Sequence, residues 1–125
     1  MSSSSVSYLF SEISDEALSA LSELGFSDTG TRRLCLHASE EDLLHVMLVE
    51  IKPNTFFRYH SHTSDEFVFM LSGAIKVLEK EGPARCFSTD GLLGGIIPAG
   101  TLHAVESDKS GAKYLEVIRG PFIKS

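Results

Sequence analysis

The stretch TFFRYHSHTSDEFVFMLSG, residues 55–73, contains two runs of β-forming residues separated by a short polar segment. On a strand, successive side chains alternate between the two faces, so His60 and His62 are predicted to point to the same side, close enough to share one ion. The polar segment 63–65 can turn the chain, and Glu66 would then return its carboxylate to that face. This stretch therefore predicts part of a metal site between two paired strands.

From Arg33 onward, short β-rich runs alternate with turn-forming residues, and no helical period lies between them. Many short strands at even spacing predict an all-β fold, an antiparallel sandwich or barrel. We expect two parts without a repeat or a second domain: an N-terminal leader and helix over 1–30 and a barrel over 31–125. The predicted strands are 33–37, 43–51, 55–62, 66–71, 74–79, 84–88, 95–97, 102–106 and 113–118. Predicted turns between them include 52–54, 72–73, 80–83, 98–100 and 108–111.

The N-terminal region has a different pattern. The serine run Ser2–Ser5 is of low complexity and is expected to be a leader without a site. Ser14 is placed to cap a helix over 15–24, with acidic residues in its first turn and Gly25 at its end. The helix has one apolar stripe, so we expect it to pack as a lid on the outside of the main fold.

Composition excludes several classes of function. The formal net charge is −6 with only 11 Lys+Arg, and no clustered basic face is visible, so we expect no nucleic-acid partner. Cys35 and Cys86 are too far apart to form a cysteine metal motif. The N-terminus has no secretion-signal pattern, and the most apolar later stretch, 91–105, is broken by glycine and proline, so we expect no membrane span. These features predict a cytoplasmic protein that binds a small molecule.

A fourth metal ligand is available outside the opening stretch. His103 follows the turn Pro98-Ala99-Gly100 and begins an apolar run. Together with His60, His62 and Glu66, it would supply three imidazoles and one carboxylate, a set that suits a divalent transition metal ion. Iron, manganese, nickel, cobalt and zinc all remain possible, and an octahedral ion would keep two positions for water, oxygen or substrate.

These residues resemble the two motifs of the cupin superfamily. The spacing His60-x-His62-x3-Glu66-x6-Gly73 is similar to the first motif, and Pro98-x-Gly100-x2-His103 is similar to the core of the second. The resemblance covers about residues 43–118. It implies a cupin barrel, a jelly-roll-like double-stranded β-helix, with metal ligands at the four matching positions.

Three positions depart from the cupin pattern. Asn54 stands six residues before His60 where a glycine is expected, and it tolerates positive φ better than most residues. The glycine that opens the second motif is displaced to Gly91, with Leu92 in its usual place. Ser107 replaces an asparagine that often follows the last histidine. All three are scaffold positions, so they affect loop shape rather than metal ligation.

Strand alternation also predicts the surroundings of the ion. Arg58 has the same parity as His60 and His62, so we expect it to face the cavity, where it would bind an anionic substrate group. The alternative is a place at the barrel mouth, in a salt bridge or in solvent. Met70 follows Glu66 inward by the same parity, together with Val68 and, after His103, Val105. An apolar wall with few polar groups is typical of a small-molecule pocket, and Met70 is predicted to contact the substrate.

The opposite faces of these strands carry aromatic residues: Phe57, Tyr59, Phe67 and Phe69. Apolar residues on both faces indicate that a second sheet, the helix or a partner chain covers the strands, and we expect a homodimer. His45 is interpreted as a hydrogen-bonded core residue. Glu116 is a weaker pocket candidate, because its strand does not show which face is inside.

Two functions are compatible with this site. The first is an enzyme, either an iron-type dioxygenase or an isomerase or lyase that needs only Lewis-acid polarisation. A vaguer resemblance, in Phe57-Arg58-x-His60-x-His62 and Leu115-Glu116-Val117-x-x-Gly120-Pro121, is to the WbuC-type cupins encoded among O-antigen polysaccharide genes, and it implies a sugar or sugar-nucleotide substrate. The second is a non-catalytic metal- and ligand-binding module, a sensor or storage protein. A metal-independent sugar epimerase is disfavoured, because its chemistry does not need a complete ligand set.

Overall fold

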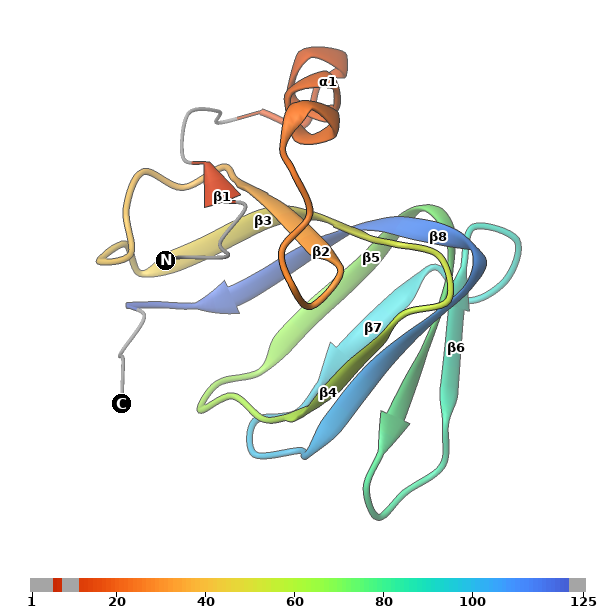
Figure 1. Cartoon of the computed structure of the whole chain (residues 1–125). Coiled ribbons are helices and arrows are strands. Elements are labelled where there is room, and N and C mark those ends of the chain that lie inside the picture. The colour runs from red at the N-terminus through yellow and green to blue at the C-terminus, as the bar shows by residue number, and fades with distance from the viewer. Residues whose placement is uncertain (1–5, 8–11, 122–125) are drawn as a thin grey trace.

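The computed structural model describes residues 6–7 and 12–121, and the serine run Ser2–Ser5 lies outside them. Within these residues, one helix lies between the first and second strands of an eight-stranded sheet that folds over itself (Figure 1). The all-β prediction is confirmed, whereas the division at residue 30 stays a prediction. The elements are β1 (Val6–Ser7), α1 (Asp15–Glu23), β2 (Thr31–Cys35), β3 (Leu44–Ile51), β4 (Phe56–His60), β5 (Glu66–Glu79), β6 (Arg85–Ser88), β7 (Gly94–Ile97) and β8 (His103–Arg119).

The sheet folds into two layers because its two longest strands, β5 and β8, take part in both. The first residues of β8 pair with β4 and with the end of β5. Its last residues pair with β3 and with the start of β5. Figure 1 shows both strands bending from one layer into the other. The layers enclose the interior between them, which is the jelly-roll arrangement that the sequence predicted.

Two glycines lie where the long strands bend. Gly73 and Gly111 have φ of 76° and 69°, a left-handed conformation that glycine adopts at low cost. They also touch, and a Cβ added to Gly73 would clash with the carbonyl oxygen of Gly111. The sequence predicted that turns at 72–73 and 108–111 would separate shorter strands. The structure instead has one continuous strand across each position, β5 and β8, and their pairing shifts register at the bends.

The helix and the strands bury two separate apolar clusters. The helix α1 begins at the Ser14 cap, as predicted, and packs outside the sheet. It ends at Glu23, one residue before the predicted end, and Leu24 is an extended C-cap. The outer cluster centres on Ala17, Leu21, Leu34 and Leu48. The cluster between the layers contains Val49, Ile51, Val68, Met70, Ile75, Val77, Phe87, Ile97, Val105, Ala112 and Tyr114.

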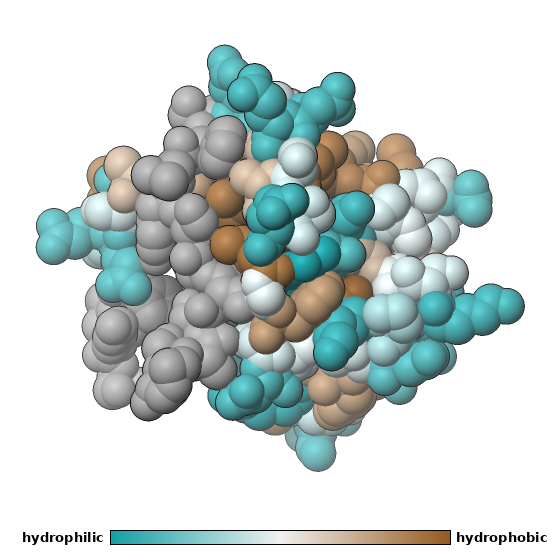
Figure 2. All heavy atoms as spheres, turned by 45° about the horizontal axis from the view of Figure 1, so that its top comes forward, coloured by the Kyte–Doolittle hydropathy of each residue, from teal (hydrophilic) through white to brown (hydrophobic). Residues whose placement is uncertain are grey.

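The face that carries α1 mixes hydrophilic and hydrophobic side chains (Figure 2). Such a surface is expected where an amphipathic helix turns its polar side outward. In the described part of the chain, no helix is both long and apolar enough to cross a membrane.

The turn before β4 is held by a residue of β8. Asn54 adopts a positive φ of 53°, as the sequence predicted for the residue at this position. The buried hydroxyl of Ser107 donates to the carbonyl of Lys52 and accepts from the amide of Thr55 at 2.9 Å. These bonds hold the start of β4 against β8 and so position the strand that carries His60.

Candidate metal centre

Four predicted ligands meet at one end of the interior. His60 ends β4 and stands directly opposite His103, which begins β8. Glu66 begins β5, and His62 lies in the connection between β4 and β5. One nitrogen or oxygen atom from each of the four side chains lies within 4.8 Å of the others. Residues that are up to 43 positions apart in the chain are thus brought to a single point.

The orientation of the imidazoles suits a bound cation. The Nδ1 atoms of His60 and His103 lie 2.9 Å from the carbonyl oxygens of Arg58 and Thr101. A carbonyl accepts, so each Nδ1 carries a proton, and in the neutral ring each Nε2 then has the lone pair that can bind a metal. Such a backbone contact is a common way to orient a metal-binding histidine.

Three buried atoms of this cluster have no hydrogen-bond partner among the described residues: His62 Nε2, Glu66 Oε1 and His103 Nε2. Glu66 Oε1 lies 3.3 Å from each of the two nitrogens. Two ligands of one ion can lie up to about 4.2 Å apart when each bond is about 2.1 Å, so these distances fit. Buried polar atoms without a partner are costly, and one cation would satisfy all three. The residues therefore fit a divalent transition metal ion.

The pKa values show how the cluster behaves toward protons. Burial acts to raise the pKa of Glu66, but contacts with Glu116, His103 and His62 outweigh it, and the pKa lies well below its usual range. Burial lowers the pKa of His60, and the neighbouring imidazoles add to this effect. For His103, burial acts to lower the pKa, but the contact with Glu66 raises it above its usual value. Glu66 is therefore ionised, and the proton on His103 is the one that competes most directly with a metal.

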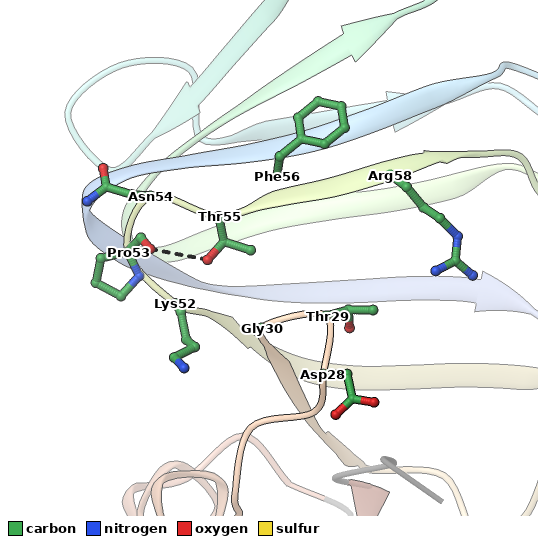
Figure 3. A pocket seen from close by; sticks show the side chains of 9 residues that line it. All are labelled: Asp28, Thr29, Gly30, Lys52, Pro53, Asn54, Thr55, Phe56 and Arg58. Atoms are coloured by element: carbon green, nitrogen blue, oxygen red, sulfur yellow. Dashed lines mark hydrogen bonds between the residues drawn. The ribbon is translucent and has the colours of Figure 1, made fainter.

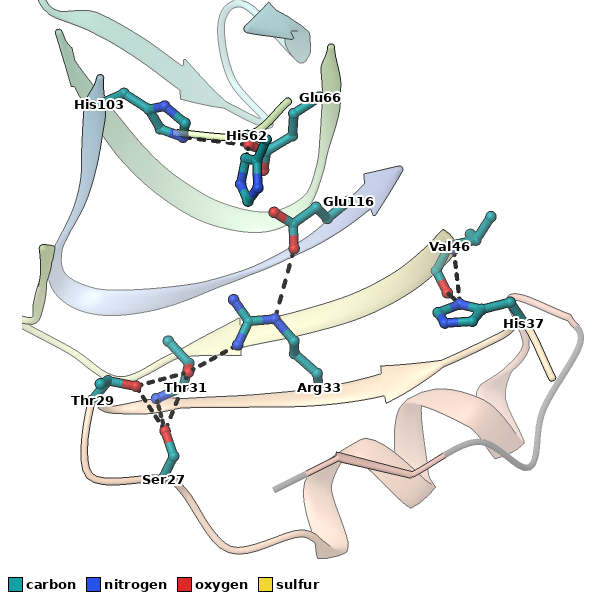
Figure 4. A network of polar contacts seen from close by, with 10 residues as sticks. All are labelled: Ser27, Thr29, Thr31, Arg33, His37, Val46, His62, Glu66, His103 and Glu116. Atoms are coloured by element: carbon teal, nitrogen blue, oxygen red, sulfur yellow. Dashed lines mark hydrogen bonds and ion pairs between the residues drawn. The ribbon is translucent and has the colours of Figure 1, made fainter. Parts of the chain in front are cut away.

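A second carboxyl group lies behind the cluster. Glu116, on β8, is only 5% exposed and faces Glu66 (Figure 4). Burial and the charge of Glu66 raise the pKa of Glu116 well above its usual value, although Arg33 acts against them. Arg33 Nε lies 3.7 Å from Glu116 Oε1. The weaker sequence candidate Glu116 is thus inside, next to the ligands.

Sequence reasoning missed Arg33 altogether. It reaches the interior from β2, where its cross-strand neighbour is the core residue Val49. Its Nη1 donates to the hydroxyl of Thr31 at 3.3 Å, which continues the line of polar contacts away from the cluster (Figure 4). A single charged residue within an apolar run, such as Glu116, indicates that an oppositely charged residue is buried beside it. Here that residue, Arg33, is on another strand. Local sequence does not identify that partner.

Arg58 does not lie where parity placed it. The pairing of β4 with β8 shifts register between Phe57 and His60, which is a bulge. Phe57 therefore packs against the interior cluster, contrary to the prediction, and its ring lies 5.0 Å from that of His60. Arg58 is exposed. The exposed position of Arg58 agrees with the second of the two predicted placements, in solvent, and not with the first, toward the cavity, because a bulge inverts the alternation on which the first depended.

The exposed Arg58 lines a surface pocket of about 490 Å³ (Figure 3). The pocket lies between the start of β2 and the start of β4, and none of the four cluster residues lines it. The inward placement of Val68, Met70 and Val105 is confirmed by their burial in the interior cluster. Phe67 and Phe69 lie on the outer face, at 39% and 36% exposure. Contact of Met70 or Arg58 with a substrate stays a prediction.

Comparison with known proteins supports the fold. No curated protein matches the sequence. A cupin superfamily protein (DSY2733) from Desulfitobacterium hafniense has a TM-score of 0.66 at 14% identity, over 87% of this chain and 94% of that one. A chain from the structures of the DMSP lyases RdDddP and RnDddQII has a TM-score of 0.55 at 21% identity, over 62% of this chain. Only 38% of the lyase chain is covered.

A third similar structure is the oxalate decarboxylase of Bacillus subtilis, studied for its Mn(II) centres, with a TM-score of 0.54 at 17% identity. The match covers 75% of this chain and 26% of the decarboxylase. The family model described as "Domain of unknown function (DUF6016)" matches residues 13–83, which include three of the four cluster residues. The chain therefore belongs to the DUF6016 family, and its fold is that of the cupins.

Proposed function

We propose that the protein is a metal-dependent enzyme that acts on a small molecule in the cytoplasm, with His60, His62, Glu66 and His103 as metal ligands. The observation that carries this proposal is the group of three buried, unpartnered atoms that face one another in the cluster. A divalent transition ion bound there would supply a Lewis acid or, with iron, a redox centre. The ligand set accepts iron, manganese, nickel, cobalt or zinc, so the metal has to be identified by analysis.

Glu116 favours an enzyme over a passive binding module. Its carboxyl group lies beside Glu66 and is held on the other side by Arg33. The raised pKa of Glu116 lets it keep a proton closer to neutral pH than an ordinary glutamate does. A group that holds and releases a proton is what isomerase and lyase reactions require. The similarity to chains of DMSP lyases is in keeping with such chemistry.

We therefore propose proton-transfer chemistry of the isomerase or lyase type on a small anionic molecule, with a sugar or sugar nucleotide as one substrate class. Dioxygenation on an iron centre is the competing reaction. The chain's own residues would divide the work: the four ligands hold the ion, Glu116 holds the proton, and Arg33 keeps the Glu116 carboxyl in place. Met70, buried in the interior cluster, would form part of the apolar wall.

The first experiment is metal analysis of protein purified without a chelator, followed by activity assays. Oxygen uptake by the iron-loaded protein with a thiol, a diketone or a phenolic acid would select the dioxygenase. Conversion of sugar substrates without oxygen uptake would select proton transfer. A bound ion without turnover on either panel would support the alternative, a sensor or storage module. Protein that binds no divalent ion at neutral pH would refute the centre.

Two variants separate the proton-holding role from the metal site. Glu116→Gln is expected to keep the metal and lose turnover, because the amide cannot exchange a proton with a substrate. Glu106→Gln, on the same strand and only partly buried, is the matched control and is expected to keep both. Equal activity of the two variants would remove Glu116 from the mechanism.

We also propose a homodimer formed through the outer face of β5 and β7. Phe67 and Phe69 lie there beside Ile96, which is 57% exposed and pairs with Phe67. The helix α1 covers the other part of this sheet, whereas nothing in the described residues covers these side chains. Exposed apolar groups of this kind mark interaction surfaces. Light scattering should show a dimer that Phe67→Glu dissociates, and a monomeric wild type would refute the interface.

A further inference from the structure

Arg33 is held in the interior with part of its guanidinium free. Its Nε faces Glu116 at 3.7 Å, and its Nη1 donates to the hydroxyl of Thr31 at 3.3 Å. The guanidinium carbon lies 5.7 Å from the centre of the Phe57 ring, a cation–π distance. No described residue accepts a hydrogen bond from Nη2, and 27% of the side chain is exposed. An oriented cation with an open donor is therefore available to a ligand.

The centre and Arg33 together have an excess of positive charge. The three imidazoles are neutral when they bind metal, so a divalent ion and Arg33 contribute three positive charges. Glu66 and Glu116 supply at most two negative charges, even when both are ionised. At least one positive charge remains uncompensated in a site partly closed to water. An anionic ligand would balance that charge, and interactions between charges are strong where water is scarce.

We propose that Arg33, and not Arg58, binds the oxyanion group of the ligand, a carboxylate or phosphate, while another oxygen of the ligand reaches the metal. This inference rests on the proposed metal centre, because the ion supplies the second point of attachment. Glu116, Thr31 and Phe57 already hold the guanidinium in place, so little side-chain freedom is lost when the anion binds. Arg58, by contrast, lines a pocket that contains none of the metal ligands.

The test uses full-length protein loaded with cobalt(II), whose visible absorption changes when an anion enters its coordination sphere. Cobalt affinity is measured first, and acetate, glycolate, pyruvate and inorganic phosphate are then titrated. Arg33→Met is expected to weaken anion binding roughly tenfold or more, as expected for the loss of a charge-assisted hydrogen bond. Cobalt affinity should stay within about threefold of the wild type, because Arg33 contacts no ligand directly. Arg58→Met, the matched control, should change neither quantity.

Removing Arg33 leaves Glu116 without its partner, and the single variant is at risk of misfolding. The double variant Arg33→Met/Glu116→Gln avoids an unpaired buried carboxylate and should show the same loss of anion affinity relative to Glu116→Gln alone. The inference would be overturned if the Arg33 variants bound anions with wild-type affinity, or if Arg58→Met lost anion affinity instead. It would also be overturned if the wild type bound cobalt but none of the four anions. Absence of cobalt binding by the wild type would refute the metal centre itself, and this inference with it.

Discussion

Replacing Glu66 with glutamine tests the metal centre through the stability of the fold. The substitution keeps the size of the side chain but removes the charge that two imidazole nitrogens face at 3.3 Å. A metal present at 100 times its dissociation constant stabilises the folded state by about 2.7 kcal/mol. For 125 residues, the unfolding entropy is about 0.26 kcal/mol/K, so this free energy raises Tm by about 10 °C.

Loss of the carboxylate should weaken metal binding about 100-fold or more. Even the substitution of a residue that only hydrogen-bonds to a ligand typically lowers metal affinity roughly 10–100-fold. At the same metal concentration, the stabilisation then falls to about 0.4 kcal/mol, a shift of less than about 2 °C. The assay is differential scanning fluorimetry with and without added metal, at a concentration set by the wild-type dissociation constant. Glu106→Gln serves as the control for adding an amide to the same protein. The reasoning is refuted if Glu66→Gln keeps the wild-type metal-dependent shift.

Three further outcomes follow from the structure. Metal affinity should fall as the pH drops through the pKa of His103, which lies above its usual value, by about tenfold per pH unit for each proton displaced. Calorimetry at several pH values measures this affinity, and an affinity that stays constant between pH 8 and 5 would contradict the prediction. Gly73→Ala should destabilise the fold by more than about 3 kcal/mol. Gly100 has a similar φ of 78° but open space around it, so Gly100→Ala should lower the stability by only about 1 kcal/mol. Equal midpoints of urea unfolding for the two variants would show that crowding at the bend is unimportant. Leu21→Ala should lower the stability by about 2–5 kcal/mol, because Leu21 is fully buried between α1 and the outer face of the sheet. Metal affinity should stay unchanged, since Leu21 belongs to the outer cluster and not to the metal centre. A change in metal affinity would mean that the helix is coupled to the site.

Local patterns in the sequence determined the residue types of the site. His60 and His62 are near enough in the chain for spacing alone to indicate a shared ion, and a turn readily adds Glu66. The Ser14 cap and the apolar stripe of α1 were equally readable, because caps and helical periodicity are local properties. Four residues of the candidate centre therefore came from the sequence, and the structure brings their ligand atoms together.

Only the tertiary structure decided which charged residues stand behind the centre. Arg33 and Glu116 are on different strands, and their contact depends on the register of both strands with β3, which no local pattern encodes. The bulge in β4 lies between Phe57 and His60, so the residues before it and the residues after it follow opposite alternations. Phe57 therefore shares the inner face with His60, and Arg58 is exposed. Alternation is reliable within an unbroken ladder, whereas the position of a bulge is set by the strand paired against it.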